Sequence, residues 1–219
     1  MGPAPHSPGS AGYWDRVARE KRFTLPLYTH WFASRMEPEA HILDFGCGPG
    51  RTLLELRRAG YNHLTGMDIS SGMLRECRSR FPAAPLVHCD GWTIPLRGDS
   101  VDAVVLLAVL TCLPSDAHQL ALVSEIRRVL RPGGLLYISD FLLNGDARNR
   151  ERYERSAPEG SVYGVFKHPE GVLLRHHRPE WIAELTRAFQ QLEYELFEAV
   201  TMNGNRSSAF QYLGRSGDI

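Results

Sequence analysis

Apolar residues in this chain fall into short runs separated by segments with helical spacing. From residue 41 onward, the runs predict strands and the spaced segments predict amphipathic helices. The predicted strands cover residues 41–45, 63–68, 85–89, 101–109 and 135–139. The predicted helices cover residues 51–59, 71–80 and a segment that starts after Ser115 and Asp116. Because strands and helices alternate, the pattern predicts an open, mostly parallel α/β sheet.

One predicted strand is apolar along almost its whole length. The run VDAVVLLAV, residues 101–109, is typical of a strand covered by helices on both faces. Nearer the C-terminus, residues 179–189 predict a helix, and residues 193–201 and 208–213 predict two closing strands joined by an NGN turn. Between these parts, residues 141–178 follow a less regular pattern.

Residues 13–36 predict two helical pieces ahead of the first strand. We expect one domain over residues 11–219, with a helical lid at 11–38 and a variable insertion at 141–178. Residues 1–10, MGPAPHSPGS, lack the basic start and apolar centre of a signal peptide. They are expected to form a disordered tail.

Composition narrows the classes of partner. The 219 residues contain 25 Lys+Arg and 25 Asp+Glu, and a protein that binds nucleic acid usually has a basic surplus. A nucleic-acid partner is therefore disfavoured. No apolar run reaches the roughly 18 residues that a bilayer requires, so no membrane partner is expected. The four cysteines show neither a CxxC pair nor zinc spacing, which favours reduced thiols, a cytoplasmic location and no metal.

Glycine falls at every second position directly after the first predicted strand, in ILDFGCGPGR at residues 42–51. A turn without side chains lets a ligand approach the backbone, and ligands of parallel sheets bind beyond the carboxyl ends of the strands. The next helix offers free N–H groups to a negatively charged atom. A nucleotide-linked oxidoreductase would place its third glycine at position 51. Arg51 stands there, so the spacing disfavours this class.

Further motifs follow in order along the chain. Asp68 ends the second predicted strand in GMDIS, Asp90 ends the third in CDGW, and LRPGG precedes the fifth. Together with DFGCGPG and DAVVLLAVL, this set resembles the class I S-adenosylmethionine-dependent methyltransferases over about residues 40–140. The likeness is greatest to the small-molecule branch typified by ubiquinone-biosynthesis enzymes. The resemblance implies a Rossmann-like sheet of seven strands in the order 3-2-1-4-5-7-6, with the last strand antiparallel and helices on both faces.

The resemblance also implies the cofactor, S-adenosylmethionine, with S-adenosylhomocysteine as its product. Asp44 and the glycines would hold the aminocarboxypropyl group, Asp68 the ribose and Asp90 the adenine amino group. Tyr13 would act as a lid residue, and the backbone at positions 91–92 and 107–108 would add contacts. The complete set of cofactor residues implied is Tyr13, Asp44, Gly46, Gly48, Gly50, Asp68, Ile69, Met73, Asp90, Gly91, Trp92, Leu107 and Ala108.

Several of these residues also have a purely structural interpretation. Asp44 can cap a turn, and Trp92 can serve packing alone. Ile69, Met73 and Tyr13 can belong to the apolar core. The three glycines that follow Asp44 favour its cofactor role, whereas for the other four residues the sequence leaves both interpretations open.

In-line methyl transfer depends mainly on alignment and on the exclusion of water, and a base is needed only for a hydroxyl or a protonated amine. His176 and His177 are the candidate catalytic residues, because neutral imidazole accepts a proton near pH 7. A structural hydrogen bond is the alternative for each. Residues 148–178 hold seven Lys/Arg and four Glu, which suits an anionic acceptor or a solvated face.

The sequence thus predicts a methyltransferase, a monomer or homodimer, that acts on an O, N or S atom of a small-molecule acceptor. The alternative is a non-catalytic sensor or partner subunit that binds the same cofactor, because its binding motifs would look identical.

Overall fold

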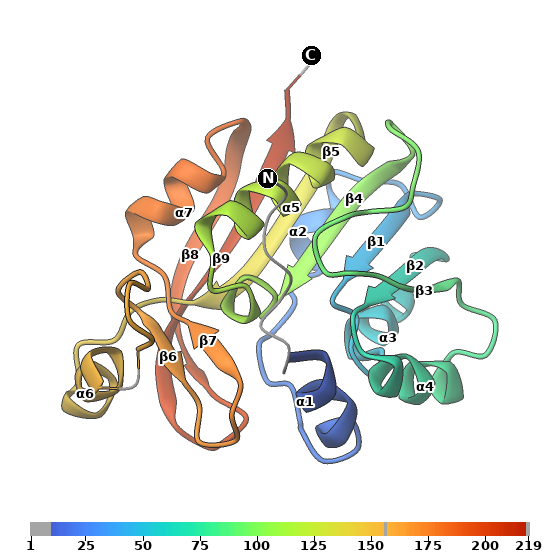
Figure 1. Ribbon diagram of the computed structural model, residues 1–219. Coiled ribbons are helices and arrows are strands. Elements are labelled where there is room, and N and C mark those ends of the chain that lie inside the picture. The colour runs from blue at the N-terminus through green and yellow to red at the C-terminus, as the bar shows by residue number, and fades with distance from the viewer. Residues whose placement is uncertain (1–9, 156, 218–219) are drawn as a thin grey trace.

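Figure 1 shows the protein, a computed structural model that describes residues 10–155 and 157–217. The main sheet has the strands β1 (His41–Phe45), β2 (His63–Asp68), β3 (Leu86–His88), β4 (Val101–Leu107), β5 (Leu130–Phe141), β8 (Phe189–Val200) and β9 (Arg206–Ser216). The helices are α1 (Ser10–Val17), α2 (His30–Ala33), α3 (Arg51–Arg58), α4 (Ser71–Arg80), the 3-10 helix η1 (Leu110–Cys112), α5 (Asp116–Val129), α6 (Ala147–Arg155) and α7 (Pro179–Leu185). Of the expected tail, residues 1–10, only Ser10 lies within the described residues, and it begins α1.

The seven strands lie in the order β3-β2-β1-β4-β5-β9-β8. Strands β1 to β5 pair in parallel, whereas β9 is antiparallel to both of its neighbours. With β8 and β9 as the sixth and seventh strands, this is the order that the resemblance implies. The α/β Rossmann-like fold predicted from the sequence is confirmed.

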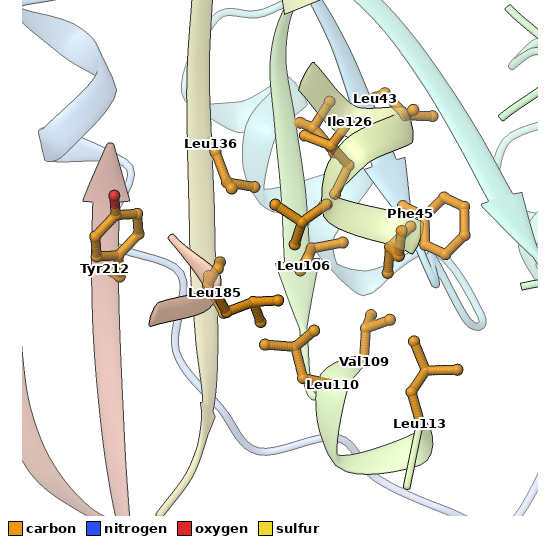
Figure 2. Packing of buried hydrophobic residues seen from close by; sticks show 14 of the residues in the cluster. Leu43, Phe45, Leu106, Val109, Leu110, Leu113, Ile126, Leu136, Leu185 and Tyr212 are labelled. Carbon is orange, nitrogen blue, oxygen red and sulfur yellow. The ribbon is translucent and has the colours of Figure 1, made fainter. Parts of the chain in front are cut away.

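The apolar character of β4 has a direct structural cause. Val104 and Leu106 point into a core formed with α5 and α7, and Figure 2 shows this packing around Leu106. Ala103 and Val105 point to the opposite face, into a core formed with α2 and α3. All four side chains are fully buried because helices cover both faces of the sheet.

Several boundaries differ from the sequence prediction, and two of them show the physical reason. Strand β5 begins at Leu130 rather than at residue 135, because Leu130 already pairs with Val101 ahead of a shift in register. Helix α7 ends at Leu185 rather than at residue 189, because Phe189 pairs with Ser216 and starts β8. In both places the pairing between strands, a long-range contact, determines where the element starts or ends.

The segment from 141 to 178 is more regular than its pattern suggests. It contains α6 and an antiparallel hairpin of β6 (Val165–Lys167) and β7 (Leu173–Arg175). Figure 1 shows α6, the hairpin and α1 below the sheet, on the side where β1 and β4 end. These elements therefore enclose the edge of the sheet at which ligands of parallel α/β folds bind.

We predict that Leu106→Ala lowers the free energy of unfolding by about 2 to 5 kcal/mol, because the substitution leaves a cavity in a fully buried layer. Chemical denaturation followed by circular dichroism measures the change. Leu196→Ala, at a side chain that is 62% exposed on β8, is the control and should change stability by less than about 0.5 kcal/mol. Equal effects of the two substitutions would contradict a sheet that is packed against a buried core on both faces.

Candidate functional site

The loop after β1 adopts a left-handed backbone that suits glycine. Gly46, Gly48 and Gly50 have φ angles of 78°, 51° and 87°. A Cβ atom on Gly46 would lie 2.6 Å from Cγ2 of Val109, and one on Gly50 would lie 2.8 Å from Sγ of Cys77. Both the backbone conformation and the close packing therefore require glycine. Helix α3 begins directly behind this loop, with N–H groups free of partners inside the helix.

Asp68 joins this loop to the next strand. Its side chain lies at the end of β2, and its two carboxylate oxygens accept the N–H groups of Gly48 and Ser70, each at 2.8 Å. Burial raises the pKa of Asp68, and these two hydrogen bonds oppose that rise. Ser70 in turn caps α4 by accepting the N–H of Met73 at 3.0 Å. One carboxylate thus fixes the relative positions of the loops that follow β1 and β2.

Asp44 lies in β1, beneath the loop that contains Gly46, Gly48 and Gly50, which we call the glycine loop. Its side chain is 1% exposed, and neither carboxylate oxygen has a hydrogen-bond partner within residues 10–155 and 157–217. Burial raises the pKa of Asp44 well above its ordinary value. Because an unpartnered buried carboxylate is destabilising, this position suits a ligand that brings a cation or hydrogen-bond donors to the loop.

A cavity of about 790 Å³ opens at this edge of the sheet, a volume within the usual range for small-molecule sites. Nine of the thirteen cofactor residues that the sequence suggests line this cavity: Tyr13, Gly46, Gly48, Asp68, Ile69, Met73, Gly91, Leu107 and Ala108. The other four lie outside its lining: Asp44, Gly50, Asp90 and Trp92.

Asp90 and Trp92 have a structural environment. Asp90 accepts the N–H groups of Trp92 and Thr93 at 3.0 and 2.8 Å and the Thr93 hydroxyl at 2.7 Å, which fixes a tight turn. The Trp92 ring stacks on His118 with the ring centroids 4.6 Å apart. Asp90 thus forms the turn and lies outside the cavity lining, its adenine contact stays a prediction, and Gly91 is the residue of this turn that lines the cavity.

Ala108 lines the cavity in a conformation that is rare for a residue with a side chain. Its φ angle is 54°, and its N–H donates to the carbonyl of Ser139 at 2.9 Å. The carbonyl of Ala108 accepts the thiol of Cys112 at 3.3 Å. Such left-handed positions cluster at functional sites, so the turn after β4 is shaped to present its backbone to the cavity.

The N-terminal helix is joined to the β6–β7 hairpin across the cavity. The Tyr13 hydroxyl donates to Oε2 of Glu170 at 2.6 Å, and Nζ of Lys21 contacts Oε1 of the same carboxylate at 2.8 Å. These two hydrogen bonds lower the pKa of Glu170. Tyr13 and Glu170 both line the cavity, so this contact joins two parts of its wall.

His177 belongs to a fixed hydrogen-bond network outside the cavity lining. The Trp181 indole N–H donates to Oε1 of Gln119 at 2.7 Å, so the Gln119 amide nitrogen faces Nε2 of His177 at 2.9 Å and the carbonyls of Leu113 and Leu110 at 2.7 and 3.1 Å. Nδ1 of His177 then donates to the carbonyl of Phe141 at 3.1 Å. Burial lowers the pKa of His177 to about 3. Both ring nitrogens are used, so the structure assigns His177 a structural role in place of the expected catalytic one.

His176 does line the cavity, but its ring is also fixed. Oδ1 of Asn144 accepts the N–H of Ser208 at 2.7 Å, so its amide nitrogen is the group that faces Nδ1 of His176 at 3.3 Å. The Tyr153 hydroxyl lies 2.7 Å from the same Nδ1. Burial lowers the pKa of His176 well below 6.5, so the ring is neutral. The Tyr153 hydroxyl already accepts the Asn144 N–H at 3.2 Å, so a proton on Nε2, with Nδ1 accepting from Tyr153, fits these partners best. This tautomer makes Nε2 a hydrogen-bond donor rather than a proton acceptor.

Asp140 supports the region of the cavity near η1. Its side chain is fully buried and accepts the N–H groups of Phe141 at 2.7 Å and of Thr111 at 3.1 Å. Burial raises its pKa to about 7, although both hydrogen bonds favour the charged form. Phe141 and Thr111 line the cavity, so Asp140 positions two parts of its wall.

The sequence reasoning missed the basic side of the cavity. Arg148 and Arg152 on α6 and Phe166 on β6 line it, as does His168. The guanidinium carbon of Arg152 lies 3.5 Å from the centroid of the Phe166 ring. The excess of Lys/Arg over Glu in residues 148–178 was the available signal, but charge counts do not show which side chains face inward.

Comparisons with known proteins agree with this geometry. A family described as "Methyltransferase domain" matches residues 43–138. A SAM-dependent methyltransferase structure from Methanosarcina mazei superposes with a TM-score of 0.81 and 26% identity, over 88% of this chain and 99% of that one.

Curated relatives match over a part of their length. Trans-aconitate 2-methyltransferase of Paracidovorax citrulli is 37% identical over 123 residues, which cover 54% of this chain and 45% of the relative. Probable tRNA methyltransferase 9B of Bos taurus is 27% identical over 127 residues, which cover 58% of this chain and 27% of the relative. The match thus spans less than half of either relative. The second relative is named for a nucleic-acid acceptor.

The described part of the chain contains no helix with both the length and the apolar character to cross a bilayer. This agrees with the absence of long apolar runs from the sequence.

We predict that the pKa of about 7 makes Asp140 a source of pH-dependent stability. Between about pH 4 and pH 7 the folded protein retains a proton that the unfolded chain has released, so stability falls as pH rises through this window. The slope reaches at most about 1.4 kcal/mol per pH unit. Asp140→Asn should remove this component, as measured by urea denaturation at several pH values. Identical pH profiles for the two proteins would show that Asp140 has an ordinary pKa.

Proposed function

Because the chain belongs to the class I S-adenosylmethionine-dependent methyltransferases, we propose that it methylates an oxygen, nitrogen or sulfur atom of a small molecule bound in the same cavity. S-adenosylmethionine is the cofactor of this family. The observation that carries the proposal is the extent of the cavity, which runs from the glycine loop to α6 and the β6–β7 hairpin. It therefore offers space for an acceptor beside the cofactor residues.

The residues at the β1–β2 side fit the cofactor. The unpartnered carboxylate of Asp44 suits a cationic amine near the glycine loop, where side chains would block close approach. Asp68 keeps lone pairs on both oxygens after bonding two N–H groups, so it can accept ribose hydroxyls. Ile69 and Met73 supply an apolar surface for an adenine ring.

When bound, the cofactor supplies a methyl group activated by a positively charged sulfur. The protein's own contribution is to align the acceptor with that group and to exclude water. The Tyr13–Glu170 hydrogen bond joins two parts of the cavity wall, and the turn at Ala108 forms another part of the lining. His176, as a neutral Nε2–H tautomer, can orient an acceptor as a hydrogen-bond donor.

We favour a small molecule over tRNA as the acceptor. The chain has equal numbers of basic and acidic residues, and phosphate backbones bind mainly to basic surfaces. The cavity volume of about 790 Å³ also suits a compact ligand beside the cofactor. The curated relative named trans-aconitate 2-methyltransferase acts on a small molecule by its name.

Turnover separates an enzyme from a cofactor-binding sensor. Labelled S-adenosylmethionine is incubated with the protein and a panel of small thiols, amines, phenols and carboxylic acids, and transfer is followed by mass spectrometry. We expect a methylated product from at least one class. Cofactor binding without transfer to any class would favour the sensor, and preferential binding of NAD would contradict the family assignment.

We predict that Asp68→Ala weakens S-adenosylmethionine binding by about 1 to 3 kcal/mol, because hydrogen bonds to a charged group are lost. Isothermal titration calorimetry measures the change. Asp99→Asn is the control, because Asp99 is exposed, and asparagine tolerates its φ angle of 53°. An unchanged affinity in Asp68→Ala would exclude the proposed ribose role.

A further inference from the structure

A guanidinium without an anionic partner faces the acceptor side of the cavity. Arg152 lines the cavity, and within the described ranges its side chain makes no hydrogen bond or ion pair, while its Nε atom is buried. Asp146, whose negative charge acts on Arg152, already accepts hydrogen bonds from the backbone and the side chain of Asn149. Arg155 contacts Glu151 at 2.6 Å, and Lys21 contacts Glu170 at 2.8 Å. Arg152 is therefore a positive charge that the protein itself does not neutralise.

The Arg152 side chain is held in place by an aromatic ring. Its guanidinium carbon lies 3.5 Å from the centroid of Phe166, a stacking distance that fixes the plane of the group. Burial lowers the pKa of Arg152 to about 10, so the group keeps its charge at neutral pH. A partly desolvated cation without a partner is unfavourable. A ligand that brings an anion to this position would remove that cost.

On the basis of the methyltransferase function proposed above, we propose that the acceptor carries a carboxylate and that Arg152 binds this carboxylate. The planar guanidinium matches a carboxylate through two parallel N–H···O hydrogen bonds. Phe141, Phe166 and Leu174 also line the cavity, and they provide apolar surface for the carbon skeleton. The acceptor class is thus an organic acid with an apolar body.

A phosphate monoester fits this position less well. A dianion is best bound by more than one cation. The neighbouring arginines on α6 are less available than Arg152 to bind it. Arg155 is already paired, and Arg148 is exposed to solvent, with Nε 4.0 Å from Asp146. One half-buried guanidinium therefore favours the single charge of a carboxylate.

The test compares acids with their own amides on the full chain. Benzoate and benzamide, cinnamate and cinnamamide, and succinate and succinamide are titrated in the presence of S-adenosylhomocysteine, and dissociation constants are measured by ligand-observed NMR. We expect at least one acid to bind 10-fold or more tightly than its amide. Phenyl phosphate is included to test the phosphate alternative.

Arg152→Met should reduce this preference at least 10-fold, because methionine keeps the contact with Phe166 but removes the charge. Arg152→Lys should restore part of it. Arg150→Met is the matched control, because Arg150 lies on the same helix but is exposed and absent from the cavity lining. It should bind the acid as the unsubstituted protein does.

Thermal unfolding distinguishes a ligand-binding role from a structural one. Without ligand, Arg152→Met should melt at the same temperature as the unsubstituted protein or higher, because an unpaired desolvated charge is removed. A marked loss of thermal stability would show that Arg152 is structural and would overturn the proposal.

Three further results would overturn it: no acid preferred over its amide, an acid preference that survives Arg152→Met, or phenyl phosphate bound more tightly than benzoate. Calorimetry with S-adenosylmethionine is performed on every variant. Absence of cofactor binding in the unsubstituted protein would contradict the methyltransferase proposal itself, whereas intact cofactor binding without an acid preference would contradict the carboxylate alone.

Discussion

The geometry of the site depends on one buried carboxylate that accepts two backbone N–H groups. Asp68 ends β2 and bonds to Gly48 after β1 and to Ser70 before α4, so it locks two loops that are separated in the sequence. The cost of burying its charge is offset by these hydrogen bonds, which favour the ionised form. Because the glycine loop cannot hold its own shape through side chains, Asp68 gives it a fixed position relative to the sheet.

The opposite side of the cavity is fixed by different means. Asp140 bonds to the backbone at the end of β5 and in η1, and the network of Trp181, Gln119 and His177 connects α7 to α5 and to the segment before α7. These groups are buried and satisfied, so they hold the wall of the cavity without taking part in it. The segment that shapes the acceptor region is thereby attached to the rigid core rather than left as a free loop.

Charge is divided across the cavity although the whole chain is neutral. Carboxylates lie beneath and beside the glycine loop, whereas guanidinium groups lie on α6. A cationic cofactor and an anionic acceptor would each meet the opposite charge, and each would lie nearer to its own partner than to the other's. We infer that this division would let a protein without net charge discriminate between charged ligands.

The sequence by itself determined the sheet, its order through the family resemblance, and the loops at its carboxyl edge. Apolar runs indicate burial on both faces of a sheet, and alternate glycines indicate a backbone that side chains would obstruct. Both are local signals in the sequence. It did not determine the surroundings of His177 or Arg152. An imidazole that faces Gln119 and a guanidinium that lies over Phe166 are distinguished from ligand-binding or solvated groups only by their neighbours. Those neighbours come from distant parts of the chain, so only the tertiary structure could decide.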